Sequence, residues 1–399
     1  MDRIKIAYLT VNDPLDKRSW SGTTYYIGQA LQKHVGDVDF LGPVRPPWLL
    51  DKWLRAVAKI TRTLTGKEYN TKYSLVFSWY AARALKKKMR GRKYDCVVAP
   101  AASTEFSFFS TRLPSVYISD TTFELISNYY HKEFSKISPF SKWEGNMLEK
   151  RSLRKASLII YSSEWAKASA IKDYGIPAQR IGVMPLGANM DTVPDRRNIY
   201  EKEKNGVLTL LYLAVEWDRK GGPIAFEALQ SLLNKGVQAR LIVCGCVPPP
   251  EFNHPAMEVI PFLNKNKQED HERFIRLLSR CHFLILPTRA DCSLLVACES
   301  NAYGMPAITT ATGGVPDIVK DGVNGYCLPY EANGDAYAQL ISEIFSDSDR
   351  YHRLIRSSRQ RYEQSLNWEQ WAKGFSELYE QHVTKTPATR RKIVVERVS

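Results

Sequence analysis

The sequence predicts an α/β protein made of two doubly wound parallel-sheet domains that face each other across a cleft. Three observations lead to this fold class. Short runs of apolar and β-branched residues alternate with helical patterns over most of the 399 residues. These runs are almost continuously apolar, which is typical of parallel strands covered by helices on both faces of the sheet. The charged stretch 191–206 has almost no apolar periodicity and separates two sets of strands.

The expected strands form one set in each half of the chain, with helical patterns between them. They are 4–10, 95–100, 114–119 and 157–162, followed by 208–214, 240–245, 283–287 and 306–310. A helix is expected over 225–236, where Phe226, Leu229 and Leu232 recur on one face and Gly236 is placed to end it. Ligands of such sheets bind beyond the carboxyl ends of the strands.

The domain limits follow from the same pattern. After Gly325 the sequence is typical of helices to about Val383, and the last residues are basic. We expect a first domain over 1–190, a second over 191–365, a C-terminal helix at about 366–383 and a weakly ordered tail over 384–399.

Composition excludes several classes of protein. Hydrophobic residues make up 44% of the chain, and no run of 18 residues is both apolar and uncharged, so no transmembrane helix is expected. The first ten residues are too short and too charged for a signal peptide and are typical of a strand. The seven cysteines lack the spacing of zinc sites or disulfide frameworks, so we expect reduced, mostly buried thiols. We therefore expect a cytoplasmic protein.

The net charge of +14 is concentrated in one segment. Residues 45–93 hold fourteen lysines and arginines against two acidic residues, a net charge of +12. Within them, 45–67 is an amphipathic pattern with Trp53, Val57, Ile60 and Leu64 on one face. Its adjacent basic stripe is Lys52, Arg55, Lys59 and Arg62. The pattern fits peripheral binding at an anionic membrane surface on the cytoplasmic side. A helix packed on the core with a solvated basic face fits equally well, and nucleic-acid binding is disfavoured because interleaved aromatic residues are missing.

The stretch from Pro287 to Glu299 is the first candidate site. A strand ends at Pro287, a polar turn follows, and a helix is expected to begin near Cys292 or Ser293. Unpaired amides near Ser293, Leu294 and Leu295 would suit a diphosphate. Asp291 and Glu299 lie slightly over two helical turns apart, so both carboxylates would project from one side toward sugar hydroxyls. An N-terminal cap at Asp291 and a solvated Glu299 explain the spacing as well.

Three further turns follow strands. Arg219 and Lys220, with two glycines after them, are suited to clamping a diphosphate. Gly22 lies beside hydroxyl residues at an expected helix start, without the three-glycine fingerprint of nicotinamide enzymes. Gly313 and Gly314 form another loop. A plain turn explains each of these features when it is taken alone.

In this order the motifs resemble the retaining glycosyltransferases of the GT-B fold, family 4 type. The matching residues are Asp291, Glu299, Gly304, Pro306, Gly313, Gly314, Pro316 and Asp317. The Arg219–Lys220 turn resembles the family's basic pair, 20–31 its first glycine loop and 183–191 its domain junction. The resemblance covers about residues 4–380.

The resemblance implies a role for each residue. Gly22 would lie near the donor phosphates, and Arg219 and Lys220 would bind them. Leu294 and Leu295 would offer backbone amides. Asp291 would hold a hydroxyl of the transferred sugar, and Glu299 would hold the ribose. The region of Phe262 and Leu263 would hold the base, Asp120 would face the acceptor, and the C-terminal helix would cross back onto the first domain.

The sequence departs from the family pattern at four places. Asp291 is one methylene shorter than the usual glutamate, and Leu294 replaces a glycine, which would crowd the sugar. Val215 stands where an arginine is usual, so Arg219 would substitute for it. Ser119 replaces a histidine beside Asp120, and a structural cap or loop role is the alternative to an acceptor-side role for Asp120.

The expected reaction moves a sugar from a UDP- or GDP-linked donor to a hydroxyl of a glycan or lipid-linked acceptor, with retention. No metal and no cofactor are expected, because the basic pair and helix amides would stabilise the leaving diphosphate. One alternative is a degenerate, non-catalytic partner or scaffold of the same fold. Others are an epimerase or a phosphorylase, the latter requiring a pyridoxal cofactor.

Overall fold

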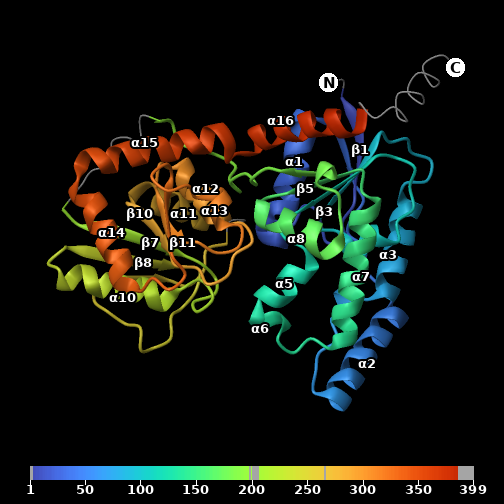
Figure 1. Ribbon diagram of the computed structural model, residues 1–399, viewed down its shortest axis with the longest axis horizontal. Helices are drawn as coiled ribbons and strands as arrows, with labels where there is room; N and C mark the ends of the chain where they lie inside the picture. The colour runs from blue at the N-terminus through green and yellow to red at the C-terminus, as the bar shows by residue number, and fades with distance from the viewer. Residues whose placement is uncertain (1–2, 197–198, 200–205, 265–266, 385–399) are drawn as a thin grey trace. The chain divides into compact units, whose positions relative to one another are not determined.

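The computed structural model describes residues 3–196, 199, 206–264 and 267–384 (Figure 1). The chain divides into two compact units: unit 1 is Met1–Met184 with Trp371–Ser399, and unit 2 is Pro185–Gln370. The first boundary between the units therefore lies six residues before the expected limit at 190. The second boundary lies five residues after the expected limit at 365. The segment after Met184 belongs to unit 2 because Ala188 N donates to Leu366 O at 2.9 Å and the Cys298 thiol donates to Leu186 O at 3.6 Å.

Unit 1 is built on a parallel sheet in the order β2-β1-β3-β4-β5-β6. Its strands are β1 (Ile4–Tyr8), β2 (Gly36–Phe40), β3 (Cys96–Pro100), β4 (Ser115–Ser119), β5 (Leu158–Tyr161) and β6 (Ile181–Val183). The four strands expected from apolar runs are present. Charged β2 and the short β6 lie at the two edges, where fewer side chains need burial, and the sequence did not predict them.

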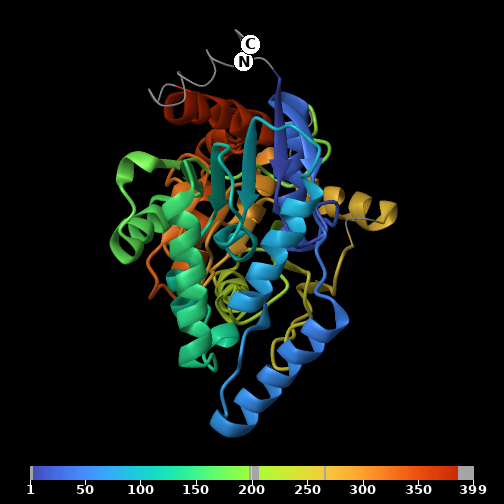
Figure 2. The same ribbon diagram turned by 90° about the vertical axis from the view of Figure 1, so that its right-hand side faces the viewer.

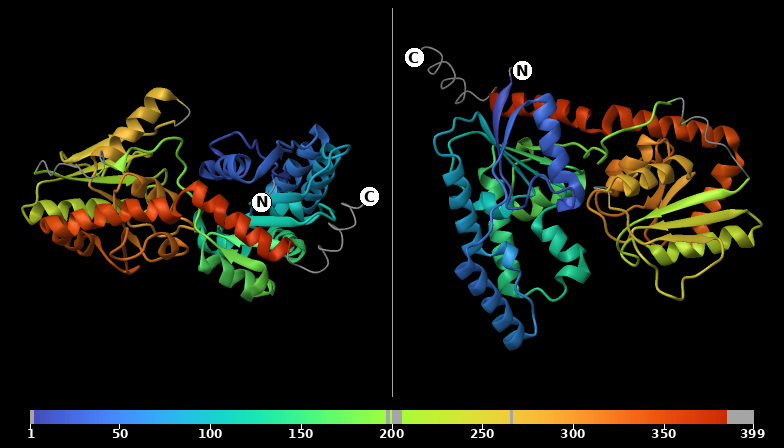
Figure 3. Two further views of the ribbon diagram at one scale, coloured as in Figure 1. Left: turned by 90° about the horizontal axis from the view of Figure 1, so that it is seen from above. Right: turned by 180° about the vertical axis from the view of Figure 1, so that it is seen from behind.

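The helices of unit 1 lie on both faces of its sheet (Figures 1 and 3). They are α1 (Thr23–His34), α2 (Trp48–Thr65), α3 (Leu75–Lys88), α4 (Ser103–Ser107), α5 (Phe123–Tyr129), α6 (His131–Phe134), α7 (Pro139–Lys155) and α8 (Glu164–Tyr174). The C-terminal α16 (Trp368–Tyr379) buries Trp371 and Phe375 and brings Tyr379 beside Cys96 of β3. A π-helical turn, Glu380–Thr384, follows it.

Helix α2 differs from the expected amphipathic pattern at one position. Leu54 is its only buried residue and packs with Tyr69 and Phe77. Val57 packs against the same cluster, so it does not lie with the other three residues that the sequence placed on its face. Trp53, Ile60 and Leu64 are exposed.

Unit 2 repeats the architecture with the order β12-β11-β10-β7-β8-β9, again all parallel. Its strands are β7 (Leu208–Leu213), β8 (Ala239–Cys244), β9 (Met257–Ile260), β10 (Phe283–Leu286), β11 (Ala307–Thr310) and β12 (Gly325–Leu328). Its helices are α10 (Gly222–Asn234), α11 (Gln268–Arg280), α12 (Leu295–Ala302), α13 (Val315–Ile318), α14 (Gly334–Ser346) and α15 (Ser348–Ser365). The chain after Gly325 is thus not helical at once, because its first residues add β12 to the sheet.

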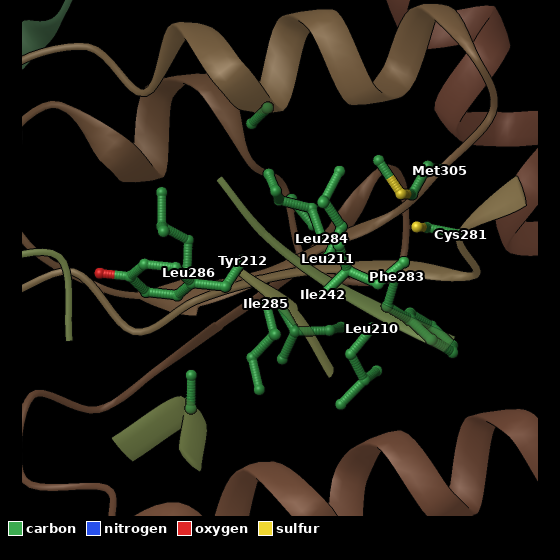
Figure 4. Packing of buried hydrophobic residues seen from close by; sticks show 14 of the residues in the cluster. Leu210, Leu211, Tyr212, Ile242, Cys281, Phe283, Leu284, Ile285, Leu286 and Met305 are labelled. Carbon is green, nitrogen blue, oxygen red and sulfur yellow. The ribbon is translucent and has the colours of Figure 1, made fainter. Parts of the chain in front are cut away.

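The core of unit 2 explains why these segments become central strands. All four residues of β10 are buried, and Leu284 and Ile285 lie among Leu210, Leu211 and Ile242 (Figure 4). The predicted fold class, two doubly wound parallel sheets, is confirmed.

The sequence also predicted reduced, mostly buried cysteines and no transmembrane helix. All seven cysteines are free thiols, five of them buried, as predicted. Among the described residues, every helix is too short or too polar to cross a lipid bilayer.

Replacing Leu284 by alanine should lower the free energy of unfolding by about 2–5 kcal/mol, because it leaves a cavity in the middle of β10. Urea denaturation followed by circular dichroism measures the change. Val259→Ala, on edge strand β9 where the side chain is 37% exposed, is the control and should cost about 0.5 kcal/mol or less. Equal losses in the two variants would contradict this description of the core.

Candidate functional site

The loops after β7 and β10 meet at the carboxyl edge of the unit 2 sheet. These two strands are neighbours, and the strand order reverses between them, which is where doubly wound sheets hold ligands. The backbone N–H of Arg289 donates to Arg219 O at 2.8 Å, and the Thr288 hydroxyl donates to the same oxygen at 3.4 Å. The two loops that sequence analysis singled out are therefore joined.

A glycine permits this contact. Gly221 has a φ of 74°, and a Cβ built on it would lie 1.9 Å from the carbonyl oxygen of Pro287. Any other residue would push the two loops apart and strain the backbone. The glycine is needed for loop packing, whether or not a phosphate is bound.

Lys220 and Asp291 form an ion pair across the joined loops. Their side chains are only 15% and 9% exposed. The Ser293 amide also donates to Asp291 Oδ1 at 3.3 Å, and the Gly314 amide, from the loop after β11, donates to Asp291 O at 3.2 Å. Two candidates named separately in the sequence thus form one charged pair, and three loops meet at Asp291.

Helix α12 begins later than predicted. Its N-cap is Leu294 and its first residue is Leu295, because Asp291 and Ser293 form a local side-chain turn ahead of it. Asp291 is therefore not the helix cap. The amides of Ser293 and Leu295, expected to be unpaired, both have acceptors in the protein: Asp291 Oδ1 and, at 2.6 Å, Ser293 O.

Two side chains on this segment are buried. Leu294 is fully buried in the core of unit 2, so it does not crowd the exposed side of the loop. Glu299, in the second turn of α12, is 3% exposed, which is inconsistent with a solvated helix residue. A carboxylate buried to this extent needs specific partners.

Arg219 connects the same two loops through its side chain. Its Nε donates to Glu216 Oε1 at 2.9 Å, its Nη2 donates to the same oxygen, and its Nη1 donates to Ala290 O at 2.9 Å. The guanidinium therefore positions the loop around Asp291. It occupies the region that sequence analysis assigned to phosphate binding, with protein atoms as its acceptors.

Arg289 was not singled out from the sequence. Its guanidinium lies 3.5 Å from the ring centroid of Tyr330, and its buried Nη1 has no hydrogen-bond acceptor among the described residues. It adds a third cation to the joined loops. Its place in the turn after β10, two residues before Asp291, is the signal that could have identified it.

Phe262 and Leu263 follow β9, at the same carboxyl edge and two strands away from β7. Phe262 is 61% exposed, and Leu263 is buried. The ring of Phe262 is therefore accessible from solvent and able to stack on a planar ring, whereas Leu263 is not accessible.

The loop after β1 in unit 1 is strained. In the 3₁₀ turn Ser19–Gly22, Trp20 and Ser21 have φ values of 47° and 55°, and Gly22 has a φ of 89° just before α1. Left-handed backbone costs about 1–3 kcal/mol at each non-glycine residue and is often found at ligand sites. Trp20 Nε1 donates to Asp120 Oδ2 at 3.1 Å, so the Gly22 loop and Asp120 lie together at the carboxyl edge of this sheet.

Glu105 holds the loop after β1 at the same edge of the sheet, and the sequence analysis did not identify it. Its carboxylate is buried and accepts the backbone N–H of Val11 at 2.6 Å, which fixes the start of the loop after β1. Burial raises the pKa of this carboxyl to about 7. Nothing in the local sequence distinguishes it from a solvated glutamate near a helix start.

Within the described residues, no three His, Cys, Asp or Glu side chains are grouped closely enough to hold a metal ion. In the unit 2 site, Lys220 and Arg219 are instead each paired with one carboxylate, Asp291 and Glu216 respectively.

Known families match both halves of the chain. Residues 195–361 match the family model described as glycosyl transferases group 1. Residues 22–192 match the model described as glycosyltransferase family 4.

Individual proteins are similar to this chain over different lengths. The chain is 31% identical over 125 residues to spore coat protein SA of Bacillus subtilis, covering 29% of this chain and 33% of that protein. It is 22% identical over 299 residues to D-inositol 3-phosphate glycosyltransferase of Corynebacterium kroppenstedtii, covering 70% and 64%. The match therefore spans less than two thirds of either relative. The fold is similar to that of HepE from Anabaena, crystallised with UDP and glucose, with a TM-score of 0.59 and 16% identity over 95% of this chain and 100% of that one.

Glu105→Gln should flatten the dependence of stability on pH. The folded-state pKa of about 7 lies above the ordinary 4.5. Folding is therefore unpenalised below about pH 4.5, where the carboxyl is protonated in both states, and loses up to about 3 kcal/mol as the pH rises to 7. Glutamine should remove that loss and still accept the Val11 amide. Urea unfolding from pH 4.5 to 7.5 measures it, with exposed Glu133→Gln as the control. Parallel curves for wild type and Glu105→Gln would contradict the burial argument.

Proposed function

We propose that this chain, which belongs to the glycosyl transferases of group 1, transfers a sugar from a nucleoside-diphosphate sugar to a hydroxyl group of an acceptor. The observation that carries the proposal is the Lys220–Asp291 pair at the strand-order reversal of unit 2, just ahead of α12. A cation that binds phosphate and a carboxylate that binds hydroxyls are the two groups that such a donor needs side by side.

Lys220 is the proposed contact to the diphosphate. Its ammonium is held at the loop junction, and the positive end of the α12 dipole adds to its field. Arg289, on the joined loop after β10, has one buried nitrogen without an acceptor among the described residues and is positioned to assist. Arg219 keeps the loop in place through Glu216 and Ala290, and a direct phosphate contact would require it to leave Glu216.

The remaining donor contacts follow the polarity of the site. Asp291 would accept hydrogen bonds from the transferred sugar, and buried Glu299 would accept them from the ribose. Phe262 would stack on the base beside Leu263. The Leu294–Leu295 turn would place helix-end amides toward the phosphates, once the local bonds of Ser293 and Leu295 open. HepE, which has the same fold, was crystallised with UDP, and this favours UDP as the first nucleotide to test.

The proposed chemistry is a single displacement with retention. The acceptor oxygen forms its bond to the anomeric carbon on the face that the diphosphate leaves, the bond from that carbon to the phosphate oxygen breaks, and the acceptor proton moves to the departing phosphate. Lys220 and the α12 dipole stabilise the negative charge that develops. Asp291 is bonded to Lys220 and to the Ser293 amide, which lowers its ability to act as a nucleophile in a double displacement.

The acceptor is proposed to contact unit 1 at Asp120. The carboxylate is held by the Trp20 indole within the strained Gly22 loop. An aromatic ring beside a carboxylate is a combination that suits a saccharide, with the ring under its apolar face and the oxygens on its hydroxyls. We take the acceptor to be a glycan or a lipid-linked saccharide.

Lys220→Ala should lower kcat/KM by about 100- to 1,000-fold, because the charge that stabilises the leaving diphosphate is removed. Release of UDP or GDP from a panel of their sugars measures it. Lys235→Ala, at the exposed end of α10, should leave turnover unchanged. If the folded wild-type protein binds these nucleotide sugars but releases no UDP or GDP from them, the non-catalytic alternative is favoured. Equal turnover in the Lys220→Ala and Lys235→Ala variants would refute the role of Lys220.

Turnover should persist in excess EDTA, because Lys220 and the α12 dipole supply the positive charge that a divalent ion would otherwise supply. The same release assay, run with EDTA and then with added Mg²⁺ or Mn²⁺, measures this. A loss of activity in EDTA that either ion restores would overturn metal independence without affecting the assignment of the donor site.

A further inference from the structure

Helix α2 carries an apolar stripe that faces solvent. Leu49, Trp53, Ile60 and Leu64 are separated by four, seven and four residues, so they share one side of the helix. Their side chains are 71%, 47%, 56% and 78% exposed. Unit 1 buries Leu54 on the neighbouring side of the helix, so the exposed stripe is not part of this core cluster.

The start of α7 carries a second group of exposed apolar side chains. Phe140 and Trp143 are more than half exposed, and their rings stack with centroids 5.7 Å apart. Phe140 also stacks on Tyr69 at 6.3 Å, and Tyr69 packs against Leu54 of α2. These contacts and the views of Figures 1 and 2 place the C-terminal end of α2 and the N-terminal end of α7 at the same end of unit 1.

The backbone fixes the two helices together. The Glu68 amide, three residues after α2 ends, donates to Lys136 O at 2.7 Å, and the Ser138 amide donates to Glu68 O at 2.8 Å. The two hydrogen bonds made by the backbone N–H and C=O of Glu68 therefore fix the end of α2 relative to the start of α7.

Basic side chains flank the stripe. Lys52, Arg55, Lys59 and Arg62 lie along the adjacent face of α2. Arg55 pairs with Asp51, whereas the other three form no ion pair among the described residues. The net charge of +12 over residues 45–93 surrounds them.

The exposed apolar stripe and the neighbouring basic side chains together favour one kind of binding partner over others. A second copy of the chain would bring the same positive charge against this one, which opposes association. An anionic bilayer accepts both features, because tryptophan and aliphatic side chains enter the region between headgroups and acyl chains while lysine and arginine contact lipid phosphates.

We propose that the exposed stripe of α2 and the Phe140–Trp143 pair form one docking surface for an anionic lipid bilayer. The segment 45–93 alone does not define this surface, because the start of α7 supplies part of its aromatic area. Docking would bring unit 1 to acceptors carried by lipids, a consequence that rests on the proposed function. Docking itself is independent of catalysis.

Flotation of the full chain with vesicles tests the proposal. Vesicles of phosphatidylcholine with about one third phosphatidylglycerol should bind the protein, and pure phosphatidylcholine vesicles should bind it much less. Ile60→Glu and Trp143→Glu should each weaken binding by about tenfold or more. Lys52→Gln together with Lys59→Gln should weaken it by about fivefold per residue.

Ile171→Glu is the matched control for Ile60→Glu, since Ile171 is 39% exposed on α8 of the same unit. It should bind vesicles as the wild type does, and all variants should unfold at the wild-type temperature. The proposal is overturned if anionic vesicles do not bind the wild type, or if Ile60→Glu and Ile171→Glu bind alike. It is also overturned if Ile60→Glu only converts a dimer to a monomer, or if an oligonucleotide binds where vesicles do not. Normal Trp143→Glu binding with impaired Ile60→Glu binding would remove α7 from the surface.

Discussion

The contact between the turn after β7 and the loop after β10 fixes the geometry on which the unit 2 site depends. The carbonyl oxygen of Pro287 leaves no room for a Cβ at Gly221, and the backbone of Arg219 accepts hydrogen bonds from Thr288 and Arg289. Because the loops are held this closely, Lys220 and Asp291 pair although 71 residues separate them. A cation and an anion are thereby kept together at the point where the sheet opens, without requiring any bound ligand.

Unit 1 reaches a comparable arrangement by different means. Three consecutive residues with positive φ precede α1, and such a backbone persists only when the surroundings hold it. The Trp20–Asp120 hydrogen bond holds the end of the loop, and buried Glu105 holds its start at Val11. Burial makes ionisation of the Glu105 carboxyl unfavourable, so the free energy of unfolding is lower at neutral pH than at acidic pH because of this residue. This is consistent with a loop selected for its shape more than for its stability.

The sequence predicts the parts of the fold that depend on burial and misses those that depend on contacts between distant residues. Central strands such as Phe283–Leu286 are continuously apolar and could be recognised, whereas edge strands such as Gly36–Phe40 are partly exposed and charged and could not. Motif order singled out Lys220, Asp291 and Glu299 as candidates. It did not reveal that Lys220 binds Asp291, that Leu294 points into the core, or that Arg219 is bonded to Glu216. Those facts depend on how loops meet, and the spacing of residues along the chain does not contain them.

We propose that the joined loops of unit 2 bind a nucleoside diphosphate. Hydrogen–deuterium exchange of the whole protein, with and without saturating UDP, GDP or ADP, is the measurement that tests this binding. We expect slower exchange with one of these nucleotides in peptides covering 216–222 and 288–299, and little change in the peptide covering α2. Unchanged exchange in both loops with all three nucleotides, or protection confined to other parts of the chain, would contradict it.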